Sequence, residues 1–385
     1  MAFLVFGAIG GTVIPRLPGL KEQAHLTDGQ VGLALLGFAV GAVTGAAMAR
    51  VVIGGGARAW VRGGTVAVCV ALVGPALAQS LLALLGTFFV IGILTGFLDV
   101  LENAQAAAIE REERRPMING FHGFWSLGAI AGSIGAAAAA HVGLPPLVHF
   151  GLVGMVLAIA SIPLLAAVPD TRGGAATVLP AGVTMWHIGA AVGAVGAIAF
   201  LGILIETGGA DWSAIYLREF GHEDPGVAAI GYAGFATAMT VVRFSADRLT
   251  ARVGPGALLM LGGLVGGGGF AIAIGEPSPA MSISGFALVG AGAAVMVPLA
   301  FSAAANLGTT GTTLSVVMSS GYTGSIVGPF LVGQTADRIG LRWALSIPLL
   351  ASAAVVLVAF RLRRLAEFGA PRLADVDLDQ PDAVL

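Results

Sequence analysis

The sequence predicts an all-α membrane protein with twelve transmembrane helices arranged as two six-helix bundles. Three observations predict this class. The 385-residue chain is 57% hydrophobic and only 10% charged, whereas a soluble domain usually carries about 25% charged residues. Its apolar residues form long continuous segments instead of alternating with polar ones, which argues against a β-barrel. The longest loop between these segments falls near the middle of the chain.

Most of the apolar segments are long enough to cross the ~30 Å hydrocarbon core of a bilayer as helices. They cover residues 1–18, 29–50, 60–79, 81–109, 118–140, 145–168, 186–207, 226–245, 255–275, 279–304, 313–335 and 341–360. The first segment looks short, because Pro15 and Pro18 interrupt it after about 14 residues and a span needs ~20. We therefore expect the native start to lie upstream of Met1. Glycine inside such segments permits close helix packing, as in Gly128-x-x-x-Gly132.

Residues 169–185, PDTRGGAATVLPAGVTM, have the Gly, Thr and Pro content of a linker. They divide the chain into an N-terminal bundle, residues 1–168, and a C-terminal bundle, residues 186–360. The remaining tail, residues 361–385, is short, ends in an acidic stretch and is predicted to be disordered. Two six-span halves are typical of an internally repeated transporter, whose binding site lies at the interface between the halves.

The basic residues predict the orientation, because cytoplasmic loops carry an excess of Arg and Lys. With the N-terminus inside, fourteen of the nineteen fall on the cytoplasmic side and five on the outer side. All but one are arginine, and an Arg-, Ala- and Gly-rich chain is typical of GC-rich bacterial genes. We expect a multi-pass protein of the bacterial inner membrane with the linker and both termini in the cytoplasm.

Charge and cysteine content exclude several classes of protein. The formal net charge is −2, which argues against a nucleic-acid partner, since such proteins usually present a basic face. The single cysteine, Cys69, excludes an internal disulfide framework and a cysteine-rich metal site. We expect no cofactor and no metal.

The stretch GFLDVLENAQAAAIE, residues 96–110, places Asp99, Glu102 and Asn103 on one helix face, at i, i+3 and i+4. Counted back from Glu110, Asp99 lies about 16 Å and Glu102 about 12 Å inside the segment. Ionisable groups at such depth are costly and usually functional. They either face a central cavity and bind protons or substrate hydroxyls, or fasten helices at the cytoplasmic gate. We favour the first role for Asp99 and leave both open for Glu102.

A second acidic stretch ends the seventh segment, where Glu206 precedes Gly208 and Gly209. Each glycine weakens a helix by ~1 kcal/mol relative to Ala, so we expect the helix to bend there and expose backbone groups to a ligand. We favour a place in the outer cavity for Glu206. For Asp211 we favour capping of a short outer helix over a place in the cavity or gate. Trp212 is either part of that gate or an anchor at the membrane interface.

Three further side chains are candidates. His122 and Trp125 lie one turn apart in the fifth segment, where a histidine can relay protons and a tryptophan can stack on a sugar. Packing of the fifth segment is the alternative, and we favour it for His122, which lies close to a basic loop. Arg16 is the only base near the outer end of the first segment. It either pairs with an outer-cavity acid, Glu206 or Asp211, or extends to the lipid headgroups.

Several stretches resemble the major facilitator superfamily. VVRFSADRLTARVG, with Arg243, Asp247 and Arg248, is similar to the family's Gly-x-x-x-Asp-Arg-type motif in the cytoplasmic loop after the eighth span. The loop after the second span, MARVVIGGGARAWVR, lacks the motif's acid. Within the superfamily, GFLDVLENAQAAAIE, INGFHGFWSLGAIAGSIG and ETGGADWSAIYLREF resemble the bacterial fucose-permease-like transporters. The resemblance implies the major facilitator fold, with a cavity lined by spans one, four, seven and ten.

The leading hypothesis is a secondary active transporter, a permease or symporter, that moves a small solute such as a sugar by alternating access. Asp99, Glu102 or Glu206 binds the coupling proton, since protonation lowers the cost of occluding a carboxylate. The chain has no P-loop in a fitting context, which argues against ATP as the energy source. The alternatives are a proton-coupled drug or metabolite efflux pump and, more remotely, a non-transporting membrane sensor.

An enzyme is not expected. None of the six histidines pairs with another at i+4, and the sequence contains neither Gly-x-Ser-x-Gly nor His-Glu-x-x-His. We expect a monomer whose partners are a small-molecule solute, protons and the lipid bilayer.

Overall fold

The computed structural model describes residues 2–49, 52, 57–113, 118–166, 190–275, 278–307 and 312–369. Within these ranges the secondary structure is helical and contains no strand, which confirms the predicted all-α class. The elements are α1 (Ala2–Val13), the 3₁₀ helix η1 (Ile14–Arg16), α2 (Leu17–Gln23), α3 (Asp28–Ala49), α4 (Ala57–Ala71), α5 (Gly74–Leu77), α6 (Leu81–Glu113), α7 (Ile118–His141), α8 (Pro146–Ala166), α9 (Ala190–Glu219), α10 (Pro225–Val253), α11 (Pro255–Gly275), α12 (Pro279–Ala293), α13 (Met296–Leu307), α14 (Thr312–Ile339), α15 (Leu341–Ala344) and α16 (Ser346–Gly369).

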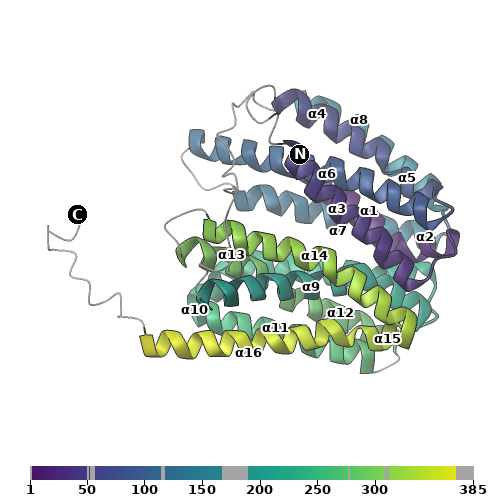
Figure 1. The fold of residues 1–385 in the computed structure, drawn as a ribbon. Coiled ribbons are helices and arrows are strands. Elements are labelled where there is room, and N and C mark those ends of the chain that lie inside the picture. The colour runs from purple at the N-terminus through teal and green to yellow at the C-terminus, as the bar shows by residue number, and fades with distance from the viewer. Residues whose placement is uncertain are drawn as a thin grey trace.

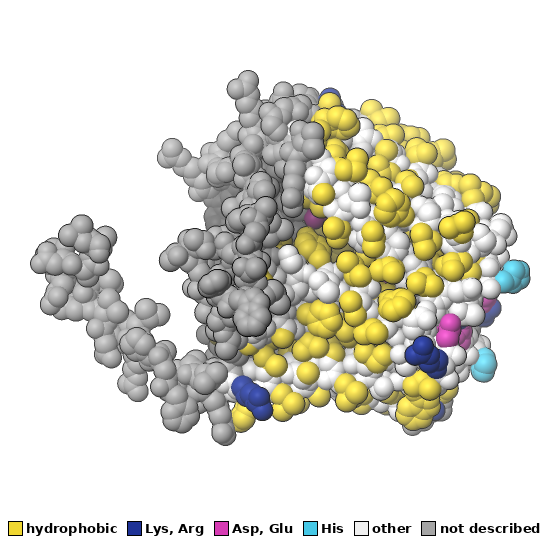
Figure 2. Space-filling view, viewed as in Figure 1, with side chains coloured by type: hydrophobic (Ala, Val, Ile, Leu, Met, Phe, Trp, Pro, Cys, Tyr) yellow, Lys and Arg dark blue, Asp and Glu magenta, His cyan; other side chains and the backbone are white. Residues whose placement is uncertain are grey.

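The part of the chain that the structure describes contains 11 helical stretches long and apolar enough to cross a membrane. A further apolar helix, Pro146–Ile162 within α8, is shorter. Together they follow the order of the twelve predicted segments. Hydrophobic side chains cover the flank of the molecule in Figure 2, whereas basic, acidic and histidine side chains gather at its right-hand end. This distribution is that of a multi-pass membrane protein.

The first span is longer than the sequence suggested. Residues Ala2–Gln23 form one helical path through α1, η1 and α2, and the two prolines do not end it. Pro15 lies in the first turn of η1 and Pro18 in the first turn of α2. First-turn N–H groups have no intrahelical acceptor, so proline is tolerated at these positions.

The helices gather into two groups, here called the N-terminal half (α1–α8) and the C-terminal half (α9–α16) (Figure 1). The halves meet mainly where α3 packs on α14 and α7 packs on α10. The predicted linker, residues 169–185, lies outside the described residues, so the bundle boundaries stay predictions. Helix α16 continues to Gly369, nine residues into the predicted tail.

Glycines bring helix backbones into contact within the N-terminal half. A Cβ on Gly41 or Gly45 of α3 would meet a carbonyl oxygen of α6, and a Cβ on Gly92 of α6 would meet the carbonyl of Phe38. The same holds for Gly128 and Gly132 of α7, which face carbonyls of α1. The predicted role of the Gly128-x-x-x-Gly132 pair in close packing is therefore confirmed, and small residues let these helices approach as membrane helices do.

We predict that Gly92→Ala lowers the thermal stability of the detergent-purified protein by about 1–3 kcal/mol, because the new methyl group overpacks a backbone contact. Gly86→Ala, on the same helix, is the matched control, since a Cβ there meets nothing within 4 Å. The melting temperatures of the two variants check this. Equal loss in both would show that α3 does not constrain α6 at Gly92.

Candidate functional site

The acidic face of α6 lies in the last turns of a candidate membrane span, Leu81–Asn103. The side-chain Nδ2 of Asn103 donates two hydrogen bonds to Asp99. One goes to the Asp99 backbone carbonyl at 2.8 Å, and the other goes to the Asp99 carboxylate oxygen Oδ1 at 3.1 Å. Glu102, one turn from Asp99, is only 4% exposed. Asn103 thus binds Asp99 on one helix face, and Glu102 is removed from solvent beside them.

The interface between the halves brings a C-terminal residue close to this face. Tyr322 of α14 lies within electrostatic range of Asp99. The tyrosine is 51% exposed, so its ring is not packed away inside the C-terminal half. The Asp99–Asn103 pair of the N-terminal half and a phenol of the C-terminal half therefore lie within electrostatic range of each other. Sequence alone does not connect Tyr322 with Asp99, because the two residues lie in different halves and no periodicity relates them.

An ion pair joins α9 to α10 inside the apolar part of the C-terminal half. The Arg243 Nη2 lies 3.3 Å from Glu206 Oε1 and 3.2 Å from Oε2. Both side chains are partly exposed, at 29% and 22%. The predicted outer-cavity acid Glu206 therefore has a basic partner, which the sequence reasoning had placed in a cytoplasmic loop.

The structure corrects that loop assignment. Helix α10 continues to Val253, so the stretch with Arg243 and Arg248 is helical and not a loop. Arg243 lies a turn and a half further into the membrane than Arg248, which is exposed. Asp247 lies in the same helix, and its side chain lies outside the described residues, as does that of the candidate His122 on α7.

The predicted bend in the seventh span is wrong. Helix α9 runs unbroken from Ala190 to Glu219, through Gly208 and Gly209. A Cβ on Gly208 would meet Pro348 of α16 at 2.9 Å, and one on Gly209 would meet Phe235 of α10 at 2.8 Å. The glycines are there for close packing against neighbouring helices, and this packing offsets their low helix propensity.

Asp211 consequently caps no helix. It lies inside α9, 9% exposed, with Glu206 as its charged neighbour. Tyr232 of α10, 5% exposed, lies within electrostatic range of Asp211, Glu206 and Arg243. The C-terminal half therefore holds two acids, one base and one phenol together at membrane depth.

Trp212 and Arg16 also differ from expectation. Trp212 is fully buried and faces Gly333 of α14, so it is not an anchor at the membrane interface. Arg16 is 7% exposed and donates to the Leu144 carbonyl at 2.6 Å, so it does not extend to the headgroups. Within the described part of the chain it pairs with neither Glu206 nor Asp211. The turn after α7 supplies its acceptor.

Trp125, by contrast, takes part in the packing of the fifth span, which was one of the alternatives for this stretch. It is partly buried on α7, and its backbone carbonyl contacts Gly7 of α1. This contact accounts for its place in the packing of the fifth span and leaves its proposed stacking role a prediction.

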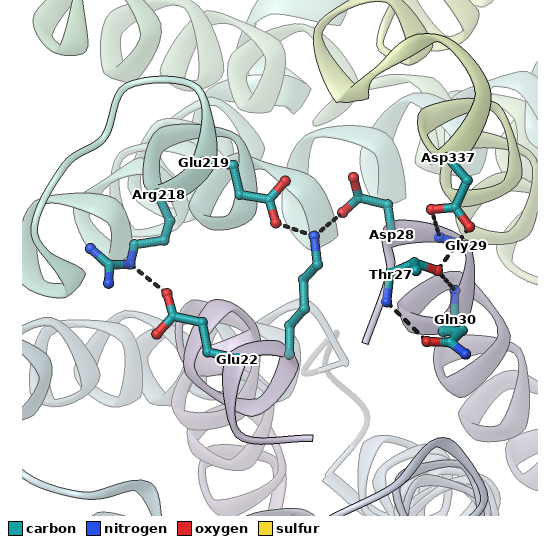
Figure 3. A network of polar contacts seen from close by, with 9 residues as sticks. Glu22, Thr27, Asp28, Gly29, Gln30, Arg218, Glu219 and Asp337 are labelled. Carbon is teal, nitrogen blue, oxygen red and sulfur yellow. Dashed lines mark hydrogen bonds and ion pairs between the residues drawn. The ribbon is translucent and has the colours of Figure 1, made fainter. Parts of the chain in front are cut away.

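One end of the molecule carries charged contacts between the halves, and we call it the bridged end (Figure 3). Lys21 of α2 binds Asp28 of its own half at 2.7 Å and also binds Glu219 at the end of α9. Arg218 binds Glu22 of α2, with 2.7 Å between Nε and Oε1. Two ion pairs thus fasten the first span to the seventh.

A second set of contacts at the bridged end fastens α3 to α14. Asp337 accepts hydrogen bonds from the Thr27 hydroxyl and from the backbone N–H of Gly29, both at 2.8 Å. Gln334 Nε2 donates to the Gly29 carbonyl at 3.2 Å. Asp337 therefore binds the start of α3 as an N-cap from another helix would. Thr27 and Asp337 were not singled out from the sequence, where they look like ordinary loop-end polar residues.

The described residues contain no group of three or more His, Cys, Asp or Glu side chains that could hold a metal ion. A cavity of about 390 Å³ lies between α9 and α14, lined mainly by apolar residues together with Ser320 and Thr323. Its size is in the range of small-molecule sites, roughly 300–1,000 Å³.

Comparison with known proteins places this geometry in a family. The sequence profile of the Major Facilitator Superfamily matches residues 1–307. An uncharacterized MFS-type transporter of Yersinia pestis is 32% identical over 351 residues, which cover 89% of this chain and 89% of that protein. Membrane protein MosC of Rhizobium meliloti is 29% identical over 357 residues, which cover 89% and 84% of the two chains.

Solved structures share the fold at much lower identity. The nucleoside transporter NupG superposes with a TM-score of 0.70 at 13% identity, covering 96% of this chain and 98% of that one. A bacterial homolog of the human lysosomal transporter Spinster, in an inward-facing and unoccupied conformation, gives 0.70 at 14% identity, covering 94% and 95%.

We predict that Glu206→Gln and Arg243→Gln each lower the free energy of unfolding by on the order of 1–3 kcal/mol. Breaking a fully buried pair costs about 3–5 kcal/mol, and partial exposure reduces this cost. The double variant should lose less than the sum of the single losses, because neither charge is then left without its partner. Chemical or thermal unfolding of the four proteins measures the coupling, and strictly additive losses would contradict the pairing.

Proposed function

The chain belongs to the Major Facilitator Superfamily of transporters, and from this premise we propose that it is a proton-coupled secondary active transporter of a small polar solute. The observation that carries the proposal is the meeting of polar groups from both halves at membrane depth. Asp99 and Tyr322 come from opposite halves and lie within electrostatic range of each other, and ionisable groups inside a membrane span are usually functional. Binding sites of repeated transporters lie at such an interface.

We propose that the solute bears hydroxyl groups, with sugars as the first class to test. The carboxylate of Asp99, the amide of Asn103 and the phenol of Tyr322 are donors and acceptors that suit hydroxyls. The stretches in spans four, five and seven that resemble fucose-permease-like transporters support the same class. Nucleosides, which also carry sugar hydroxyls, belong in the same panel.

Intramembrane carboxylates are the proposed proton carriers. Asp99, Glu102 and Glu206 are buried or partly buried at membrane depth. An ionised carboxylate is costly to enclose, and protonation removes most of that cost. Proton binding therefore favours the occluded state, and this couples the proton gradient to the movement of solute.

The bridged end supports a specific conformational state. Its two ion pairs, Lys21–Glu219 and Glu22–Arg218, join the halves there. Arg248 and Arg252, in the last turns of α10, lie at the end of the molecule opposite the bridge, which the charge bias assigns to the cytoplasm. We propose that the bridged end faces the outside, that the structure is closed there, and that both termini are cytoplasmic in a bacterial inner membrane.

Proteoliposomes with an imposed pH gradient test the proposed function. A panel of labelled sugars, nucleosides and cationic drugs is offered, and we expect a sugar to accumulate in a way that a proton ionophore abolishes. Gradient-driven movement of a cationic drug alone would instead identify an efflux pump. If no solute moves under any gradient, the proposal fails and a non-transporting sensor becomes the better hypothesis.

We predict that Asp99→Asn and Glu206→Gln each abolish accumulation driven by the pH gradient, because the intramembrane carboxylates can then no longer exchange a proton. Glu223→Gln is the control, since Glu223 lies in the turn between α9 and α10. Full gradient-driven accumulation by both intramembrane variants would rule out these residues as proton carriers.

The Glu22–Arg218 pair allows a charge-reversal test of the bridge. We predict that Glu22→Arg or Arg218→Glu alone opens the bridged end, because like charges then face each other across the halves. The double reversal should restore the closed state. An exposed ion pair contributes only ~0.2–1 kcal/mol. The variants should therefore change the fractions of open and closed molecules, and these fractions are what the experiment measures.

Spin labels on cysteines at Val142 and Ile339, in a Cys69→Ser background, report the separation of the halves at the bridged end. Both positions are exposed, at 74% and 55%. Electron paramagnetic resonance should show a longer mean distance in each single variant than in the double. The same distance in all four proteins would show that the pair does not hold the halves together.

A further inference from the structure

Asp211 is a buried acid that the proposed function leaves without a role. Its side chain lies inside α9 at 9% exposure. In the described part of the chain, no cation and no hydrogen-bond donor contacts its carboxyl group, and Glu206 is the charged neighbour that it senses. An acid this deep in a membrane protein marks a functional site by default.

Charge balance decides the protonation state of the group. Arg243 supplies one positive charge, and Glu206 binds it through both carboxylate oxygens. A second ionised carboxylate at Asp211 would then be buried without a counter-charge and would face a like charge. Such a group neutralises by binding a proton. One ion pair and one protonated acid would leave the cluster neutral.

The helices that pack against α9 do not change this balance. Helix α10 contributes Tyr232 and Arg243, which lie with Glu206 in one electrostatic cluster. The 3₁₀ helix η1 also touches α9 and carries Arg16, whose Nη2 donates to the Leu144 carbonyl, and Glu206 rather than Arg16 is the charged group that acts on Asp211. The described residues of α2, α12, α13, α14 and α16 place no charged group within electrostatic range of Asp211.

The position of Asp211 connects it to the bridge. It lies eight residues before Glu219, about 12 Å along the helix, and Glu219 binds Lys21. Next to it, fully buried Trp212 faces Gly333 at the contact between α3 and α14. The bridged residues therefore lie between Asp211 and the water at that end.

We propose that Asp211 is the entry site of the coupling proton on the bridged side, an assignment that rests on the proposed function and adds a residue to the proposed carriers Asp99, Glu102 and Glu206. When the bridge opens, a carboxylate oxygen of Asp211 takes a proton from water and an O–H bond forms. When it closes, the neutral acid is sealed in. On release, the O–H bond breaks and the proton passes to water at the opposite end, past the partly exposed Glu206–Arg243 pair.

Infrared spectroscopy of the purified full-length protein tests the assignment without any solute. At neutral pH we expect the carbonyl band of a protonated carboxylic acid, lost from the Asp211→Asn spectrum by difference and shifted in Asp211→Glu. Asp224→Asn is the matched control, since Asp224 is half exposed at the start of α10 and Asn caps equally well. Should Asp211→Asn prove unstable, the shifted band of Asp211→Glu alone carries the test. An unchanged band in both variants overturns the inference, whereas the solute panel decides the proposed function separately.

Exchange into heavy water tests the link to the bridge. The Asp211 band shifts as its proton is replaced by deuterium, and we expect this replacement to be faster in Arg218→Glu than in the wild-type protein. The Glu22→Arg, Arg218→Glu double variant should return to the slow rate. Equal rates in the wild type and the single variant overturn the assigned direction of proton access.

Discussion

Polar groups inside a bilayer must find their partners within the protein or lose their charge, because the hydrocarbon core offers no water. This constraint accounts for the placement of most polar side chains in the bundle. Arg243 binds Glu206, Asn103 binds Asp99, and Arg16 binds a backbone carbonyl. Asp211 lacks such a partner in the described region, which is why its neutral form follows from the surroundings of the group.

The hydrocarbon core of the bilayer also determines how the helices pack. Lipid tails are as apolar as leucine, so helices gain little from burying apolar area against each other and depend on close van der Waals contact. Glycines on α3, α6 and α7 supply that contact within the N-terminal half. Between the halves, Gly32 and Gly333 let α3 and α14 touch at their backbones. The contact is close but short, and polar bonds at the bridged end complete it.

The two kinds of contact differ in how easily they break. Partly exposed ion pairs such as Glu22–Arg218 are worth about 0–1 kcal/mol each, and water competes for their charges when they separate. Backbone contacts through glycine within one half lose packing with no replacement. We therefore expect the ion pairs at the bridged end to break before the glycine contacts within either half do.

The sequence predicts the spans well and the site only in part, for physical reasons. A long apolar segment indicates that a helix is surrounded by lipid. All twelve predicted segments were found from this signal. The error at Gly208 arose because helix propensity is a local quantity, whereas packing against Pro348 and Phe235 is not. The partners in the bridge are 196 and 310 residues apart, and no periodicity connects them. Their depth within the apolar segments identified Asp99 and Glu206 as candidates. The pairing of Glu206 with Arg243, however, depends on how α10 lies beside α9.

The continuity of α9 has a consequence for how the bridge and the site communicate. A 30-residue helix is about 45 Å long, and this one carries Glu206, Asp211 and Glu219 in order from the membrane interior to the bridged end. Its glycines pack against α10 and α16 of the same half, which holds α9 within that half and opposes bending at Gly208. Opening of the bridge must then move the C-terminal half as a body. In the proposed mechanism the acids move with the bridge residues, and water reaches Asp211 through a gap that forms between the halves.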